Sequence, residues 1–81
     1  MMSDFPKFMD QFNGYPNWEQ DQKDYALEVV LKGYMSDYGV ISNTNKFLEA
    51  VKEDIEWDIA YFLEREQYEI CTLLRDLNEH L

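Results

Sequence analysis

The sequence predicts a small all-α domain, a helical bundle of three helices in which two are short and the C-terminal one is long. Three observations predict it. Apolar residues recur at helical spacings of three and four over most of the chain. Proline and glycine are scarce, and neither occurs after Gly39. The length of 81 residues suits one domain, which we take as residues 1–81.

The first predicted helix is short and lies near the N-terminus. Phe5, Phe8 and Phe12 recur at spacings of three and four, as on one face of a helix. Asn13-Gly14 should end this helix, because glycine accepts the left-handed conformation that closes helices. Tyr15-Pro16 should continue the chain as a turn.

A second helix is predicted to begin near Asn17. Asn17 can cap it, with Trp18 as its first apolar residue, and Gln20 stands three residues after Asn17, where it could complete a capping box. Gly33 weakens the helical pattern and could end it, although the pattern also allows the helix to reach Tyr38, with Gly39 as the stop.

The third helix is expected to follow an extended link or short strand at Val40-Ile41, with Asn43 or Thr44 as its cap. Its apolar positions repeat in steps of three, four and four, interrupted only at Glu66. This eleven-residue repeat, about 3.67 residues per turn, predicts a nearly straight helix. The apolar positions are Leu48, Val51, Ile55, Ile59, Phe62, Ile70, Leu73, Leu77 and Leu81.

Two arrangements are open for this long segment. It can break at Glu64-Arg65-Glu66-Gln67 and give a compact bundle, or it can stay continuous and bury its distal half against a second copy, as a homodimer. Continuity is favoured, because all four of those residues are good helix formers. Phe62, Ile70, Leu73 and Leu77 are therefore predicted to form a stripe that serves as a dimer interface or as the core.

The charge of the chain restricts its partners. Seventeen Asp and Glu residues stand against seven Lys and Arg residues, a formal net charge of −10. Phosphates of nucleic acids and of anionic membranes would repel such a protein, so direct binding to either is not expected. A protein with a basic surface is the favoured partner. The sequence also has neither a signal-peptide pattern nor an apolar run of about 20 residues, which predicts a cytoplasmic protein.

The sequence predicts neither catalysis nor a cofactor. Cys71 is the only cysteine and His80 the only histidine, so a zinc site is not expected. The pattern around Cys71 predicts a small hydrophobic residue in a core or interface. The glycines are scattered and do not form a phosphate-binding loop. We therefore expect a binding protein rather than an enzyme, with no metal and no cofactor.

Carboxylates are concentrated in the third predicted helix. Over Glu49–Glu69 the helix would rise by about 30 Å, so roughly one carboxylate would occur every 4 Å. The phosphates of one B-DNA strand are about 3.4 Å apart, so the line of charge could imitate DNA. Trp57 and Tyr61 stand among these carboxylates, either as a second packing face or as anchors of an interface. The predicted partner-binding residues are Glu49, Glu53, Asp54, Glu56, Trp57, Asp58, Tyr61, Glu64 and Glu66.

Small size, acidic helices, many aromatic residues and the lack of catalytic motifs resemble small phage-encoded inhibitors of host defence, namely antirestriction DNA mimics and anti-CRISPR proteins. The layout over residues 24–50, about a third of the chain, is similar to an antirestriction mimic. The similarity is carried by Tyr25-Ala26-Leu27-Glu28, Val40-Ile41, Thr44 and Leu48-Glu49-Ala50. It implies an inhibitor that occupies a DNA-binding surface, and Lys46 and Lys52 depart from its uninterrupted acidic face.

Three functional hypotheses follow. The first is an inhibitor that covers the basic nucleic-acid-binding surface of a nuclease or DNA-binding protein by DNA mimicry. The second is a helical adaptor or transcription regulator whose apolar stripe makes the contact. The third is an immunity protein or antitoxin that neutralises a basic toxin, which shares the electrostatic logic of the first.

Overall fold

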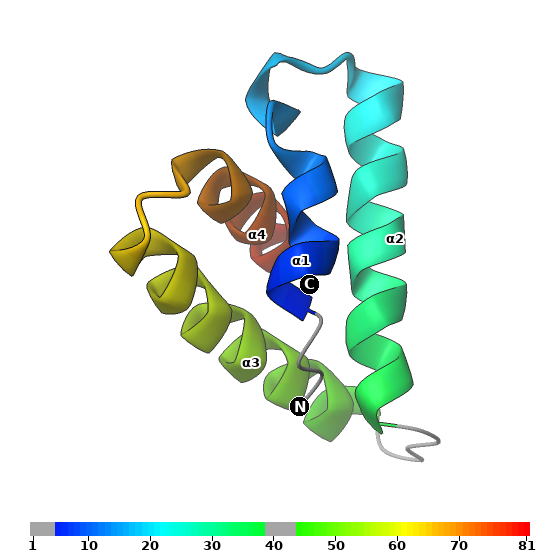
Figure 1. The fold of residues 1–81 in the computed structure, drawn as a ribbon. Helices are drawn as coiled ribbons and strands as arrows, with labels where there is room; N and C mark the ends of the chain where they lie inside the picture. The colour runs from blue at the N-terminus through cyan, green and yellow to red at the C-terminus, as the bar shows by residue number, and fades with distance from the viewer. Residues whose placement is uncertain (1–4, 39–43) are drawn as a thin grey trace.

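A computed structural model describes residues 5–38 and 44–81, and its helical content confirms the all-α prediction (Figure 1). Four α-helices lie in the described residues rather than the three expected. Two short 3₁₀-helices connect the first helix to the second. In chain order the elements are α1 (Phe5–Met9), η1 (Asp10–Phe12), η2 (Tyr15–Asn17), α2 (Gln20–Tyr38), α3 (Thr44–Glu64) and α4 (Tyr68–His80).

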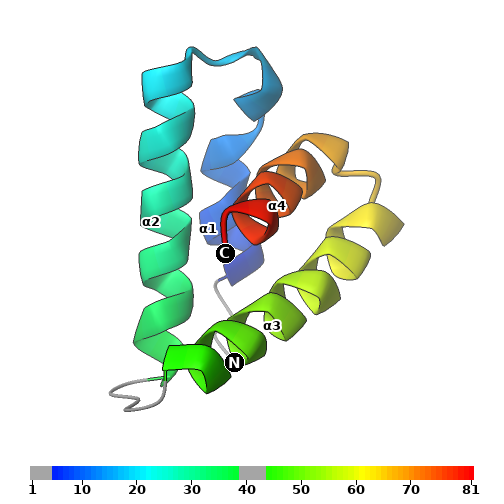
Figure 2. The same ribbon diagram turned by 180° about the vertical axis from the view of Figure 1, so that it is seen from behind.

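Helix α4 lies at the centre of the arrangement. It packs against α3, α2 and both 3₁₀-helices, whereas α3 and α2 meet at one end of the molecule (Figures 1 and 2). Helix α1 lies between α2 and the α3–α4 pair, and Phe5 connects them: its ring lies 5.4 Å from that of Tyr34 on α2 and 6.4 Å from that of Phe62 on α3. The short N-terminal helix is thereby part of the core.

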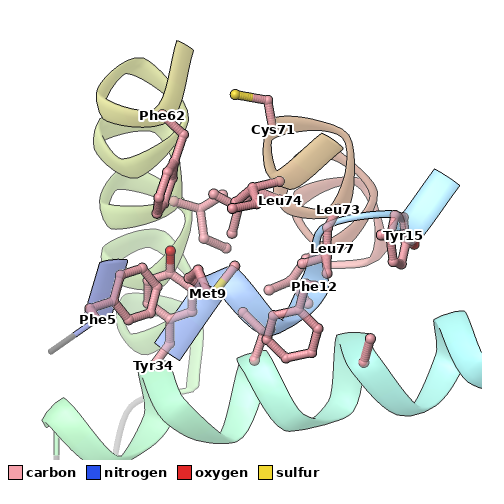
Figure 3. Packing of buried hydrophobic residues seen from close by; sticks show 14 of the residues in the cluster. Phe5, Met9, Phe12, Tyr15, Tyr34, Phe62, Cys71, Leu73, Leu74 and Leu77 are labelled. Atoms are coloured by element: carbon pink, nitrogen blue, oxygen red, sulfur yellow. The ribbon is translucent and has the colours of Figure 1, made fainter. Parts of the chain in front are cut away.

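The hydrophobic core draws on every part of the described chain (Figure 3). Helix α4 buries the widest face, because it packs against helices on more than one side. Met9 and Tyr15, which the apolar spacing did not predict, are as deeply buried as the centre of α4. The core consists of Phe5, Met9, Phe12, Tyr15, Ala26, Val30, Tyr34, Val51, Ile55, Phe62, Ile70, Cys71, Leu73, Leu74 and Leu77.

Two carboxylates of α4 hold the N-terminal segment in place. The backbone N–H of Gly14, which has the left-handed conformation predicted for it, donates a hydrogen bond to Glu69 Oε1 at 3.0 Å. The hydroxyl of Tyr15 donates to Asp76 Oδ2 at 2.8 Å. Glu69 and Asp76 are seven residues apart and therefore lie on the same side of α4. These acidic residues have a structural role.

The alkaline stability of the protein should depend on Tyr15. Burial, followed by the hydrogen bond to Asp76 and its charge, raises the pKa of Tyr15 well above its ordinary value of 10.0. The unfolded chain therefore loses this proton first, and stability is complete below pH 10 and falls above it, by at most about 1.4 kcal/mol per pH unit. Urea unfolding between pH 8 and 11.5 should show a flatter alkaline limb for Tyr15→Phe. Tyr25→Phe, a change at an exposed ring, should keep the wild-type slope; parallel curves for all three proteins would contradict the assignment.

Helix α2 begins two residues later than predicted. The predicted pair, Asn17 and Gln20, does not form a capping box, because Asn17 closes η2. Gln22 instead accepts a hydrogen bond from the backbone N–H of Glu19 at 3.4 Å, with the same spacing of three residues. The longer of the two alternatives for its C-terminus is correct, since α2 passes Gly33 and ends at Tyr38.

The third helix begins at Thr44, so Thr44 is its first helical residue and not the cap that was predicted as one of two alternatives. Three other features of this connection, the stop at Gly39, the link at Val40-Ile41 and the alternative cap Asn43, lie outside the described residues.

The prediction of one continuous C-terminal helix is wrong. Helix α3 ends at Glu64 and α4 begins at Tyr68, so the chain reverses at the tetrapeptide that was the alternative break point (Figure 2). The N–H of Gln67 donates to the carbonyl of Phe62 at 3.0 Å, and that of Glu66 to the carbonyl of Leu63 at 3.1 Å. This pair of bonds is a Schellman motif. The reversal buries the apolar residues of α4 within the same chain, which outweighs the helix propensity of the turn.

Glu66 has a left-handed backbone conformation, with φ of 59°, at the position of the Schellman motif where glycine is usual. A side chain at this φ is strained, so Glu66→Gly should raise the free energy of unfolding by about 1 kcal/mol. Glu64→Gly, two residues earlier in helical conformation, should lower it by about 0.5–1 kcal/mol. Denaturant titration of the two variants measures both effects, and a loss of stability in both would refute the strain at position 66.

Candidate functional site

The apolar stripe predicted at Phe62, Ile70, Leu73 and Leu77 is part of the core. All four side chains are at most 2% exposed within a single chain (Figure 3). Phe62 projects from α3 toward α1, and the other three project from α4. In this fold the stripe has no free surface to offer a partner helix, so an adaptor that acts through these residues is not supported.

The outward side of α3 carries an aligned row of four exposed carboxylates, Glu49, Glu53, Glu56 and Glu64, which we call the outer acidic face. Successive residues of a helix are about 100° apart, so these positions share one sector, opposite the sector of the buried Ile55. Within the described part of the chain, no lysine or arginine forms an ion pair with these four side chains. The charge of this face is therefore left to the solvent or to a partner.

The line of charge is shorter and sparser than the sequence predicted. The helix ends at Glu64, and Glu69 belongs to α4, where it accepts the hydrogen bond from Gly14. The outer acidic face extends over about 22 Å of helix, and its four carboxylates average about 7 Å apart. This spacing corresponds to every second phosphate of a B-DNA strand.

Other predicted residues lie away from this row. Asp58 is turned toward α2, where its Oδ2 accepts a hydrogen bond from the Tyr34 hydroxyl at 2.5 Å. Asp54 is exposed on the flank of α3, and Glu66 is exposed in the turn that follows the helix. The structure thus gathers four of the seven predicted carboxylates on one face and removes Asp58 from it.

The ring of Tyr61 is covered by Arg65 of the same chain. The Arg65 guanidinium lies over the ring at 3.6 Å from its centroid and donates a hydrogen bond from Nη1 to the Tyr61 carbonyl at 3.0 Å. The ring also packs edge-on against Phe62 at 5.1 Å. Tyr61 was predicted to belong either to a second packing face or to an interface anchor, and these contacts place it in a packing face.

Trp57 differs from Tyr61 and Phe62, the other aromatic side chains of α3 that the structure describes. It is 71% exposed, more than any other large hydrophobic residue described. By helical spacing it borders the outer acidic face, with Glu53 one turn before it and Glu64 two turns after it. Exposing an indole to water next to carboxylates gives a monomer no solubility benefit, whereas an exposed tryptophan is typical of the residues that anchor protein interfaces.

Cys71 and His80, the two other residues considered as possible functional groups, make contacts within the chain. Cys71 is buried, its Sγ lies 3.5 Å from the Ile59 carbonyl oxygen, and burial raises the pKa of the thiol. His80 is exposed near the end of α4, with Nδ1 2.7 Å from the Asp76 carbonyl oxygen. Among residues 5–38 and 44–81, no three histidine, cysteine or acidic side chains are grouped as metal ligands would be.

Among the same described residues, no helix has both the length and the apolar composition required to cross a lipid bilayer.

One further surface feature was not predicted. Trp18, Asp21, Gln22 and Tyr25 line a shallow depression at the start of α2. The apolar pattern assigned Trp18 to the second helix, whereas it is the C-cap of η2 and lies two residues before Gln20, the first residue of α2. The helical spacing of Tyr25 with Asp21 and Gln22 was the only signal that sequence reasoning could have used.

Comparison with known proteins adds no relative: no protein-family model, no curated protein and no solved structure matches this chain.

Proposed function

We propose that this protein is a non-catalytic inhibitor that covers the basic nucleic-acid-binding surface of a nuclease or DNA-binding protein. The contact is made by the outer acidic face of α3, with Trp57 as its anchor. The observation that carries the proposal is a row of carboxylates to which the described side chains supply no ion pair, with a 71% exposed indole beside it. Charge steers the two proteins together, and the indole supplies buried contact area once they meet.

The electrostatic part of the proposal follows from the net charge of −10 and its distribution. A cleft that binds DNA presents lysine and arginine at the spacing of phosphates, and the outer acidic face supplies a charge opposite every second one. Among the cations beside α3 whose side chains the structure describes, Arg65 is engaged with Tyr61 and Lys52 is half exposed at the edge of the face, so neither cancels its charge. Binding should therefore weaken steeply with salt, mainly through the association rate.

The proposal is tested by reversing charge on the face. Immobilised wild-type chain captures proteins from a cell extract, and excess duplex DNA then releases those held through a DNA-binding surface. The released protein is titrated against Glu53→Lys/Glu56→Lys/Glu64→Lys. We expect an affinity at least about tenfold lower than that of wild type and a shallower dependence on salt.

A matched control separates the face from net charge. Asp10→Lys/Glu19→Lys/Glu79→Lys changes the net charge by the same amount at three exposed carboxylates outside α3. This control should keep most of the affinity. Equal losses in the two triple variants, or a captured protein that duplex DNA does not release, would rule out the proposed mode of binding.

A further inference from the structure

The depression at the start of α2 is lined by two aromatic rings, one carboxylate and one amide: Trp18, Tyr25, Asp21 and Gln22. It lies at the N-terminal end of α2, whereas the outer acidic face lies on α3, so the two surfaces are separate (Figure 1). An inference drawn from the depression therefore does not rest on the proposed function.

One wall of the depression is rigid. The Trp18 ring packs against Phe12 at 6.3 Å and edge-on against Tyr15 at 6.1 Å, both of which are core residues. A methyl group added at Gly14 would meet its indole nitrogen at 3.5 Å, so that edge of the ring faces the loop. Trp18 is thereby held in one orientation before any ligand arrives.

The α2 side of the depression is exposed to solvent. Gln22 Oε1 accepts the Glu19 N–H at 3.4 Å and Asp21 Oδ1 accepts the Gln22 N–H at 3.0 Å, and Asp21 Oδ2 is the oxygen that a ligand can contact. Tyr25 is 69% exposed, and Asp21 and Gln22 precede it by one helical turn. The charge around the depression is negative: Asp21 lines it, and the exposed Glu19 and Asp24 are its neighbours in sequence. The nearest lysine in sequence, Lys23, places its ammonium over the Tyr15 ring, 5.5 Å from the centroid. An anion would be repelled, and a cation would be attracted to both the rings and the carboxylate.

We infer that this depression binds an arginine side chain of another protein. A guanidinium is planar and weakly hydrated, so it can stack on the indole or phenol face while its N–H groups donate to the Asp21 carboxylate. A lysine ammonium is strongly hydrated and has no flat face to stack, so it binds more weakly at the same place. The two aromatic rings make the site prefer arginine over lysine, and the Asp21 carboxylate makes it prefer a cation over an anion.

The test uses the Trp57→Phe variant, which leaves Trp18 as the only tryptophan and removes the anchor of the proposed inhibitor surface. The probe is N-acetyl-arginine amide, titrated while the Trp18 indole N–H resonance and fluorescence are recorded. N-acetyl-lysine amide and sodium chloride at matched ionic strength are titrated in parallel. We expect saturable shifts with the arginine probe, weaker binding of the lysine probe, and no saturation with salt.

Two further substitutions locate the site. Tyr25→Ala should weaken binding of the arginine probe by about three- to fivefold. Tyr68→Ala, which removes a comparably exposed ring from α4, should leave it unchanged. Equal binding of the arginine and lysine probes, or equal affinities in the two tyrosine variants, would overturn the inference whatever the outcome at the outer acidic face.

Discussion

Replacing Phe62 with alanine is expected to lower the free energy of unfolding by about 3–5 kcal/mol. Phe62 is 1% exposed, and its ring lies 6.4 Å from that of Phe5, which joins α1 to the core. The substitution therefore leaves a cavity where α1 and α3 meet. A chain of 81 residues has a total stability of roughly 4–12 kcal/mol, so this single change should remove a large share of it.

The neighbouring residue supplies the control for this prediction. Leu63 is 45% exposed on the same turn of α3, and Leu63→Ala should cost less than about 1 kcal/mol. Urea denaturation followed by circular dichroism measures both variants. Similar costs at positions 62 and 63 would mean that α3 presents a different face to the core from the one described.

The second large effect concerns Trp57. For the partner isolated by capture and DNA release, Trp57→Ala should weaken binding by about 30-fold or more, the loss typical of a tryptophan anchor at the centre of an interface. The loss should lie in the dissociation rate, because the substitution leaves every charge in place. The stability of the free protein should change little, since the indole is 71% exposed.

Kinetics distinguishes the anchor from the charged row. Reversal of Glu53, Glu56 and Glu64 should slow association and reduce its salt dependence, whereas Trp57→Ala should accelerate dissociation. Tyr68→Ala serves as the aromatic control, because Tyr68 is 57% exposed on α4. An unchanged dissociation rate for Trp57→Ala would place the contact elsewhere.

The helical class, the presence of α2 and most of the core on α3 and α4 could be predicted from the sequence, because they depend on apolar spacing and on few breakers. The start of α2 was misplaced by two residues, and its end was left open between Gly33 and Tyr38. The reversal at Glu66 could be predicted only as one of two alternatives. The left-handed position of such a turn is usually glycine, so a glutamate at this position does not indicate that the helix ends there. The interruption of the apolar register at Glu66 was the true signal, and helix propensity argued against it.

The candidate site shows the same division. The exposed positions of Glu49, Glu53 and Glu56 follow from periodicity within one helix. The positions of Asp58 and Glu69 depend on tertiary hydrogen bonds. Asp58 accepts from Tyr34, 24 residues away in the chain, and Glu69 accepts from the Gly14 N–H, 55 residues away. Local patterns carry no information about such pairings, so a count of carboxylates overestimated the charge available to a partner.

The attachment of the N-terminal segment to α4 has a consequence for biosynthesis. The hydrogen bonds from Gly14 to Glu69 and from Tyr15 to Asp76 join residues 55 and 61 positions apart. During translation, Phe5, Met9 and Phe12 therefore emerge from the ribosome long before the helix that shelters them has been made. While the 55 to 61 intervening positions are synthesised, these apolar side chains lack the helix that covers them, and chaperones can bind them during that interval.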